Sequence, residues 1–117
     1  MTPDQLTLAR AVVALPGWEW RPGMRWLDPG ATVLTLGWVR SPVLVPSGAV
    51  PDLQNDATGG CLLAMLATPG TVTVFYDVDR DVPGGPWGVA TGQDHASLGS
   101  TLAEACARCA LARGRWA

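Results

Sequence analysis

The sequence predicts a single α+β domain, with three helices and a small, mainly antiparallel sheet in the order α-β-β-α-β-β-α. Capped segments of apolar residues lie near the start, the middle and the end of the chain, which is typical of helices. Between them are stretches in which apolar and polar residues alternate, as they do in strands. The 117 residues include no stretch long enough to be a linker, so we expect one domain over residues 1–117.

The first helix is expected to begin after Thr2, because Thr2 and Gln5 have the spacing of a capping box. It continues to about Leu15 and is ended by Pro16-Gly17. Its apolar residues recur at helical spacing, which predicts a stripe that faces the core: Leu8, Val12 and Leu15.

The other two helices are also predicted from their first residues. We expect Asp56 to cap the central helix, which carries no charged side chain after its first turn. A helix that is apolar on every side is normally covered on every side, so we place it centrally or at an oligomer interface. The last helix begins with a second capping box, Thr101 to Glu104, and ends near Gly114. Glu104 and Arg108 are one turn apart, so we expect them to pair on its exposed face.

Four strands are expected, in two pairs. Residues 34–38 alternate in polarity, and residues 43–45 form a shorter strand that Pro46 ends. Residues 71–76 alternate and are rich in β-branched side chains, and residues 87–90 are their antiparallel partner.

Composition limits the classes of partner. Hydrophobic residues make up 48% and charged residues 15% of the chain, so we expect uncovered apolar surface and predict a homo-oligomer. The net charge is -2, without the basic stripe that double-stranded nucleic acid requires. Uninterrupted apolar segments are shorter than the roughly 20 residues of a membrane span, so no membrane partner is expected. Cys is present 3 times and no signal peptide is recognisable, which predicts a cytoplasmic protein.

Two metal hypotheses arise from the sequence. Cys106 and Cys109 form a Cys-x-x-Cys pair, and a zinc site would need Cys61 and His95 as its other ligands. The pair falls on the inner stripe of a helix, however, where free cysteine packs as a small hydrophobe. Residues 77–81 match the first calcium-loop positions but lack the required glycine and glutamate that follow. We therefore expect no metal and no cofactor.

Catalytic residues are not recognisable in the sequence. His95 is the only histidine, and its neighbours in sequence do not make a catalytic triad by themselves. Asp52 and Asp56 are better explained as a turn residue and a helix cap. We therefore expect the chain not to be an enzyme.

The segment of residues 18–26 is the most unusual stretch, because it reads Trp-Glu-Trp-Arg-Pro-Gly-Met-Arg-Trp. Indole faces and guanidinium groups together suit stacking on a base while gripping a phosphate. The competing interpretation is that the indoles pack the sheet against the helices and the arginines face solvent. If the chain binds a ligand or partner, the candidate residues are Trp18, Trp20, Arg21, Met24, Arg25 and Trp26.

Four landmarks carry a resemblance to a known family. They are the first helix followed by Gly17-Trp18-Glu19-Trp20, residues 51–58 before the central helix, Trp87-Gly88-Val89, and residues 101–105 at the start of the last helix. In this order they resemble the phage α-β-α sandwich domain family. The resemblance implies a small sheet between helices, made by a phage or prophage, in a family with no catalytic residues to transfer.

Together these observations predict a non-enzymatic phage or prophage accessory protein that acts by binding in the bacterial cytoplasm. The expected partner is a host defence protein, which it would block, or a nucleotide-like signal, which it would sequester. The alternative is an oligomeric structural or assembly protein without a small-molecule ligand.

Overall fold

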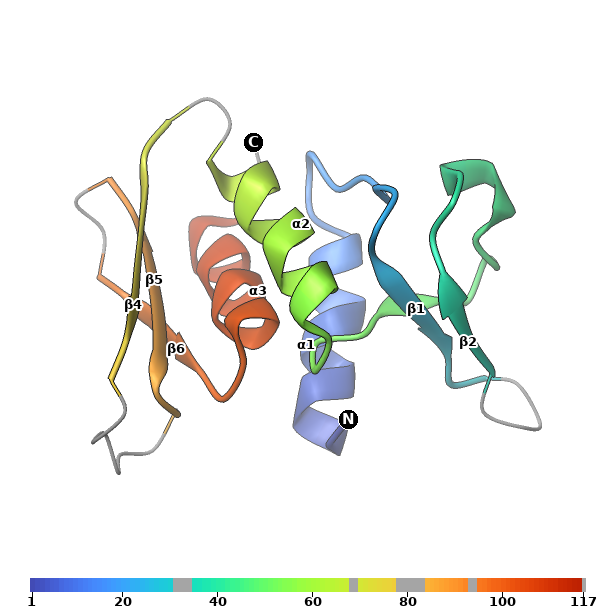
Figure 1. Cartoon of the computed structure of the whole chain (residues 1–117), viewed down its shortest axis with the longest axis horizontal. Helices are drawn as coiled ribbons and strands as arrows, with labels where there is room; N and C mark the ends of the chain where they lie inside the picture. Colours follow the sequence, from blue (N-terminus) through green and yellow to red (C-terminus); the bar gives the residue numbers. More distant parts are fainter. Residues whose placement is uncertain (31–34, 68–69, 78–83, 93–94, 117) are drawn as a thin grey trace.

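Three helices form a layer between two small sheets (Figure 1). The computed structural model describes residues 1–30, 35–67, 70–77, 84–92 and 95–116. The helices are α1 (Pro3–Val13), α2 (Asp56–Leu66) and α3 (Leu102–Arg113), with a short 3-10 helix η1 (Pro42–Leu44). The strands are β1 (Arg25–Asp28), β2 (Thr35–Trp38), β3 (Val50–Pro51), β4 (Val72–Tyr76), β5 (Trp87–Thr91) and β6 (Ser97–Gly99).

Both sheets are antiparallel and have three strands, in the orders β2-β1-β3 and β4-β5-β6. The α+β class is therefore confirmed, but the expectation of one small sheet was wrong. The sheets lie at opposite ends of the molecule with the helices between them (Figure 1). The resemblance implied the reverse order of layers, a sheet between helices.

The first turn of α1 has the predicted capping box. Thr2 Oγ1 accepts a hydrogen bond from Gln5 N over 3.2 Å, and Gln5 Oε1 accepts one from Thr2 N over 3.0 Å. The cap of α2 was predicted one residue too late. Asn55 has extended backbone and its Oδ1 accepts from Thr58 N over 3.0 Å, whereas Asp56 is already helical.

The central helix α2 lies beside α3, and the two backbones approach closely at Gly59. A Cβ atom built at Gly59 would lie 3.1 Å from Ala103 N, so a side chain here would need α3 to move slightly away. Leu62, Met65 and Leu66 are buried, but other residues of α2 are exposed, so this helix is not covered on every side.

The last helix ends at Gly114, which has φ +80° and caps it in the left-handed conformation. The predicted pair of Glu104 and Arg108 forms, with 2.9 Å between Oε1 and Nη2. Its expected position on the exposed face was wrong, because Glu104 is buried where α3 meets α1.

Sequence reasoning found β4 and β5 and missed β1, β3 and β6, which are short or contain proline. The predicted strand of residues 43–45 was wrong. Pro42 starts the 3-10 helix η1 there instead, since its fixed φ suits a helical first position. Of the predicted strand of residues 34–38, Leu34 lies outside the described residues and the rest form β2.

One cluster of buried side chains connects the three helices with both sheets. Trp116 is its largest member and is completely buried. Trp116 Nε1 donates to Val12 O over 2.8 Å, and its backbone N donates to Pro16 O over 2.9 Å. The end of the described chain is thereby attached to the end of α1. Among the described residues, no helix has the length and apolar character needed to cross a membrane.

Candidate functional site

The predicted segment of residues 18–26 is divided between two places in the fold. Trp18 and Trp20 pack edge to face with their ring centroids 5.2 Å apart, and Trp18 lies 5.4 Å from the ring of Trp116. Both indoles are half-buried against the core, and Met24 is completely buried within it. Trp18 therefore packs on the C-terminal segment, Trp20 packs on Trp18, and Met24 belongs to the buried core.

The two arginines of the segment are engaged with acidic side chains. Arg21 Nη2 lies 2.6 Å from Glu19 Oε1. Arg25 Nε lies 3.7 Å from Asp52 Oδ2, and the Arg25 guanidinium lies 5.7 Å above the ring of Trp38. Each guanidinium group therefore has an acidic neighbour, although Arg25 Nε has no hydrogen-bond partner among the described residues.

The last predicted residue, Trp26, lines a small cleft between β2 and η1. Its indole lies across Gly37, where a Cβ atom would be 2.7 Å from the ring, so only glycine fits beneath it. The cleft has a volume of about 170 Å³. Its lining residues are Trp26, Gly37, Trp38, Val39, Arg40, Ser41, Leu44 and Val45.

Large apolar side chains are exposed in the segment of residues 36–44, of which Trp38 and Leu44 line the cleft. Trp38 is 53% exposed, Leu44 72% and Val43 88%, and Leu36 is also exposed. Arg25 and Trp38 are directly paired across β1 and β2, so the guanidinium supports one side of the exposed indole. We call Leu36, Trp38, Arg40, Val43 and Leu44, together with the cleft, the Trp38 surface.

Sequence reasoning did not find the Trp38 surface, because it assigned Trp38 to a half-buried strand and Val43 and Leu44 to a second one. A signal was present in the sequence: Ser41-Pro42 breaks the alternation directly after Arg40. Residues 42–44 then turn away from the sheet, which leaves their side chains in solvent.

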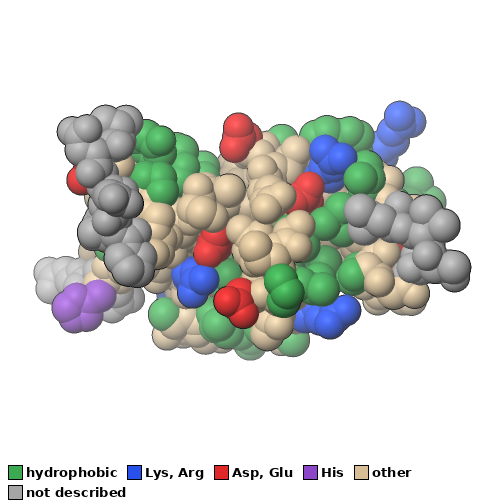
Figure 2. All heavy atoms as spheres, turned by 90° about the horizontal axis from the view of Figure 1, so that it is seen from below, with side chains coloured by type: hydrophobic (Ala, Val, Ile, Leu, Met, Phe, Trp, Pro, Cys, Tyr) green, Lys and Arg blue, Asp and Glu red, His purple; other side chains and the backbone are tan. Residues whose placement is uncertain are grey.

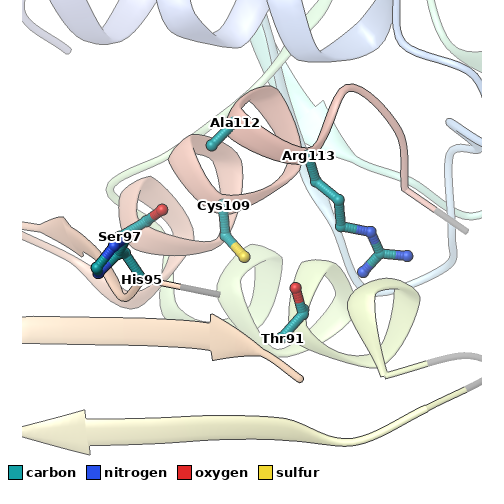
Figure 3. A pocket seen from close by; sticks show the side chains of 6 residues that line it. All are labelled: Thr91, His95, Ser97, Cys109, Ala112 and Arg113. Carbon is teal, nitrogen blue, oxygen red and sulfur yellow. The ribbon is translucent and has the colours of Figure 1, made fainter. Parts of the chain in front are cut away.

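A second, larger cavity of about 460 Å³ lies between α3 and the strands β5 and β6 (Figure 3). It is lined by Thr91, His95, Ser97, Cys109, Ala112 and Arg113. Arg113 Nη1 donates to Leu66 O over 3.5 Å, so this arginine contributes to the packing of α3 on α2.

The three cysteines are free thiols. Burial, followed by the neighbouring Cys109, raises the pKa of Cys106 to about 12, so this thiol is protonated at neutral pH. Cys61 Sγ lies 3.7 Å from Pro22 O, next to the turn before β1. Within the described part of the chain, no three His, Cys, Asp or Glu side chains gather as a metal site. Apart from Asp77, the half calcium motif falls outside the described residues.

Charged side chains are scattered among apolar ones on the face shown in Figure 2, without a large area of one sign. No family model, curated protein or solved structure matches the chain.

Proposed function

We propose that the chain is a non-enzymatic binding protein whose Trp38 surface recognises another protein. The observation that carries this proposal is the concentration of large, exposed apolar side chains within residues 36–44, two of which, Trp38 and Leu44, line one cleft. Exposed apolar patches of this kind, rimmed by polar groups, are typical of protein interaction sites. Trp and Arg are also the residues that most often dominate the binding energy of such sites.

At the Trp38 surface, the size of the cleft supports a protein partner over a nucleotide. Its volume of about 170 Å³ is smaller than the ~300 Å³ at which small-molecule pockets begin. A space of this size suits one apolar side chain of a partner, inserted between Trp38 and Leu44.

The charge beside the cleft specifies the partner further. Arg40 is exposed and forms no ion pair with any described residue. A partner that carries a carboxylate next to its apolar anchor would complement it. We therefore propose an apolar anchor flanked by an acidic residue. On the basis of the resemblance, we propose a phage or prophage setting, in which the partner is a host defence protein that becomes blocked.

The proposal is tested by capturing proteins from a lysate of the host bacterium with three tagged forms of the chain. Trp38→Glu places a charge in the centre of the Trp38 surface, and Leu111→Glu is the matched control on α3, where Leu111 is 44% exposed. The expected result is a protein captured by the unmodified chain and by Leu111→Glu but lost with Trp38→Glu. Identical sets of captured proteins would contradict the proposal.

A nucleotide ligand is the other outcome to be distinguished. Thermal unfolding of the same three forms with mononucleotides and cyclic dinucleotides measures it, because a ligand of the folded state raises Tm. We expect no increase in Tm. An increase that Trp38→Glu abolishes would replace the protein partner by a nucleotide.

A further inference from the structure

The outer edge of β4 lacks the features that normally protect an edge strand. In the described part of the chain, β4 pairs with β5 and has no other strand beside it. Its sequence, Val-Thr-Val-Phe-Tyr, contains no charge, no proline and no glycine. Natural edge strands are usually protected by charged residues, prolines or bulges, because an open edge is a template for another strand.

The hydrogen bonds to β5 show which backbone groups point outward. Asp77 N donates to Pro86 O over 3.1 Å, and Gly92 N donates to Thr71 O over 3.5 Å. In an antiparallel ladder every second residue faces the same neighbour, so residues 71, 73, 75 and 77 face β5. The N–H and C=O groups of Val72, Val74 and Tyr76 therefore point away from the sheet.

We propose that β4 pairs in antiparallel fashion with β4 of a second copy, with Val74 on the two-fold axis. In this register the outward-facing residues meet one another: Val74 lies opposite Val74, and Val72 lies opposite Tyr76. Each of these pairs exchanges two backbone hydrogen bonds. The dimer then contains one continuous sheet in the order β6-β5-β4-β4-β5-β6, and its interface is closed, as two-fold symmetry requires.

The side chains of β4 fit this register. Thr73 lies opposite Phe75 of the second copy, and Asp77 lies opposite Thr71, so no two like charges meet. Val74, Phe75 and Tyr76 are exposed, although β5 beside them is largely buried. The reason is that α3 packs against β5 and β6, whereas β4 is the edge strand of the sheet (Figure 1). A second copy would cover this apolar strand.

The occupant is a second copy because the outward backbone groups of β4 complement those of another β4, and its five residues carry no charge that would repel the copy. The edge strand β2 is less suitable, since it has four residues, includes Gly37 and is followed by Arg40. The β4 interface is also separate from the Trp38 surface, which lies on the other sheet. Loss of the dimer and loss of the protein partner can therefore be observed independently.

The test uses opposite charges on the two-fold axis. Val74→Lys and Val74→Glu each place like charges opposite one another, so we expect each variant alone to associate about tenfold more weakly or worse. An equimolar mixture of the two variants is expected to recover the dimer, because Lys then lies opposite Glu. Leu111→Lys, on α3, is the control that should associate as the unmodified chain does. Circular dichroism establishes that every variant is folded.

The masses are measured by sedimentation velocity from micromolar to millimolar protein. The unmodified chain is expected to pass from monomer to dimer and to stop there. A second substitution tests the register: Thr71→Lys faces Asp77 of the second copy and should tighten the dimer. The inference is overturned if the unmodified chain stays monomeric, forms larger arrays, or keeps its dimer in both Val74 variants separately.

Discussion

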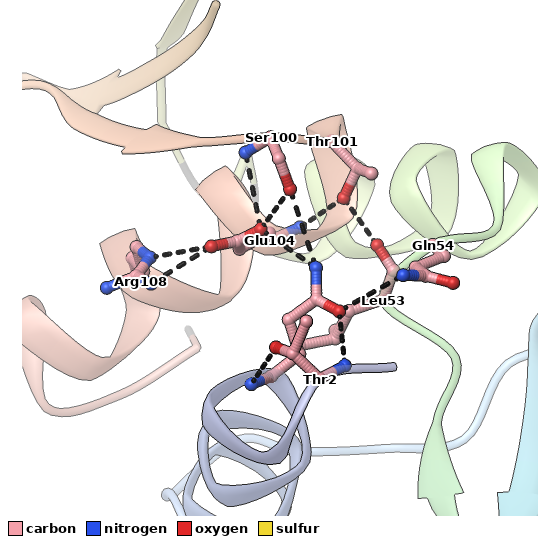
Figure 4. Close-up of polar contacts among 8 residues, drawn as sticks. Thr2, Leu53, Gln54, Ser100, Thr101, Glu104 and Arg108 are labelled. Carbon is pink, nitrogen blue, oxygen red and sulfur yellow. Dashed lines mark hydrogen bonds and ion pairs between the residues drawn. The ribbon is translucent and has the colours of Figure 1, made fainter. Parts of the chain in front are cut away.

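The substitution Glu104→Gln is expected to destabilise the fold more than its small change in shape implies. Glu104 lies where α1, α3 and the segment before α2 meet (Figure 4). Its Oε2 accepts from Gln5 Nε2 over 3.1 Å, from Ser100 N over 3.2 Å and from Ser100 Oγ over 2.5 Å. Its Oε1 accepts from Arg108 Nη2 over 2.9 Å. Both oxygens of the carboxylate thus act only as acceptors.

A glutamine at this position has one acceptor oxygen and one donor group. Its NH2 would face either the N–H of Ser100 or the guanidinium of Arg108, donor against donor. Hydrogen bonds to a charged acceptor are worth about 1.5–3 kcal/mol when one partner is removed. The Arg108 pair adds less than about 0.5 kcal/mol, since Arg108 is half exposed. We therefore expect a loss of about 2–3 kcal/mol at neutral pH.

The loss should depend on pH in a defined direction. Burial alone would raise the pKa of Glu104, but hydrogen bonds from Ser100, Gln5 and Arg108 together hold it below its usual value. A lowered pKa stabilises the folded state above the pKa of the unfolded chain, about 4.3, and this contribution is lost as pH falls through the folded value. The difference between the two proteins should be constant near neutral pH and shrink below about pH 4.

Urea denaturation of both proteins, at several pH values, measures this difference as a change in the free energy of unfolding. Glu19→Gln is the matched control, because Glu19 also pairs with an arginine but is exposed. It should change stability by less than about 0.5 kcal/mol. A loss below about 1 kcal/mol for Glu104→Gln, or one that grows as pH falls, would refute the reasoning.

Two further pairs of substitutions compare matched sites, each by urea denaturation. Trp116→Phe should cost about 2 kcal/mol, since it removes a buried hydrogen bond. Trp18→Phe should cost less than half as much, because Trp18 Nε1 has no hydrogen-bond partner among the described residues; equal losses would contradict this. Gly99→Ala should cost more than about 2 kcal/mol, because its Cβ atom would lie 2.4 Å from Ala105 N. Gly60→Ala, on α2 with open space around it, should instead stabilise the fold by about 0.5–1 kcal/mol. If Gly60→Ala destabilises the fold more than Gly99→Ala does, both predictions are refuted.

The sequence predicted those parts of the fold that depend on local signals. The capping residues Thr2 and Thr101 and the terminal Gly114 identified α1 and α3, because caps are determined by a few neighbouring residues. The long alternating strand β4 was recognised for the same reason. The strand β3 was missed because it has two residues and exists only through its pairing with β1.

The candidate site was predicted only in part, because exposure is a property of the packed molecule. Nothing local distinguishes Trp18, which packs on Trp116 almost a hundred residues away, from Trp38, which remains exposed. The ion pair of Arg25 with Asp52 likewise joins distant parts of the sequence. Of the predicted site residues, Trp26 lines the cleft of the Trp38 surface, whereas the exposed side chains of that surface were not among them.

The measurement that tests the central claim most directly is hydroxyl-radical footprinting of two matched aromatic residues. Trp38 is 53% and Tyr76 52% exposed, on different sheets. In the complex with a captured partner, we predict that oxidation of Trp38 falls relative to the chain alone at the same concentration, and that oxidation of Tyr76 does not. Raising the concentration of the chain alone should protect Tyr76 and leave Trp38 unchanged. Undiminished oxidation of Trp38 in the complex would contradict the assignment of the Trp38 surface as the recognition site.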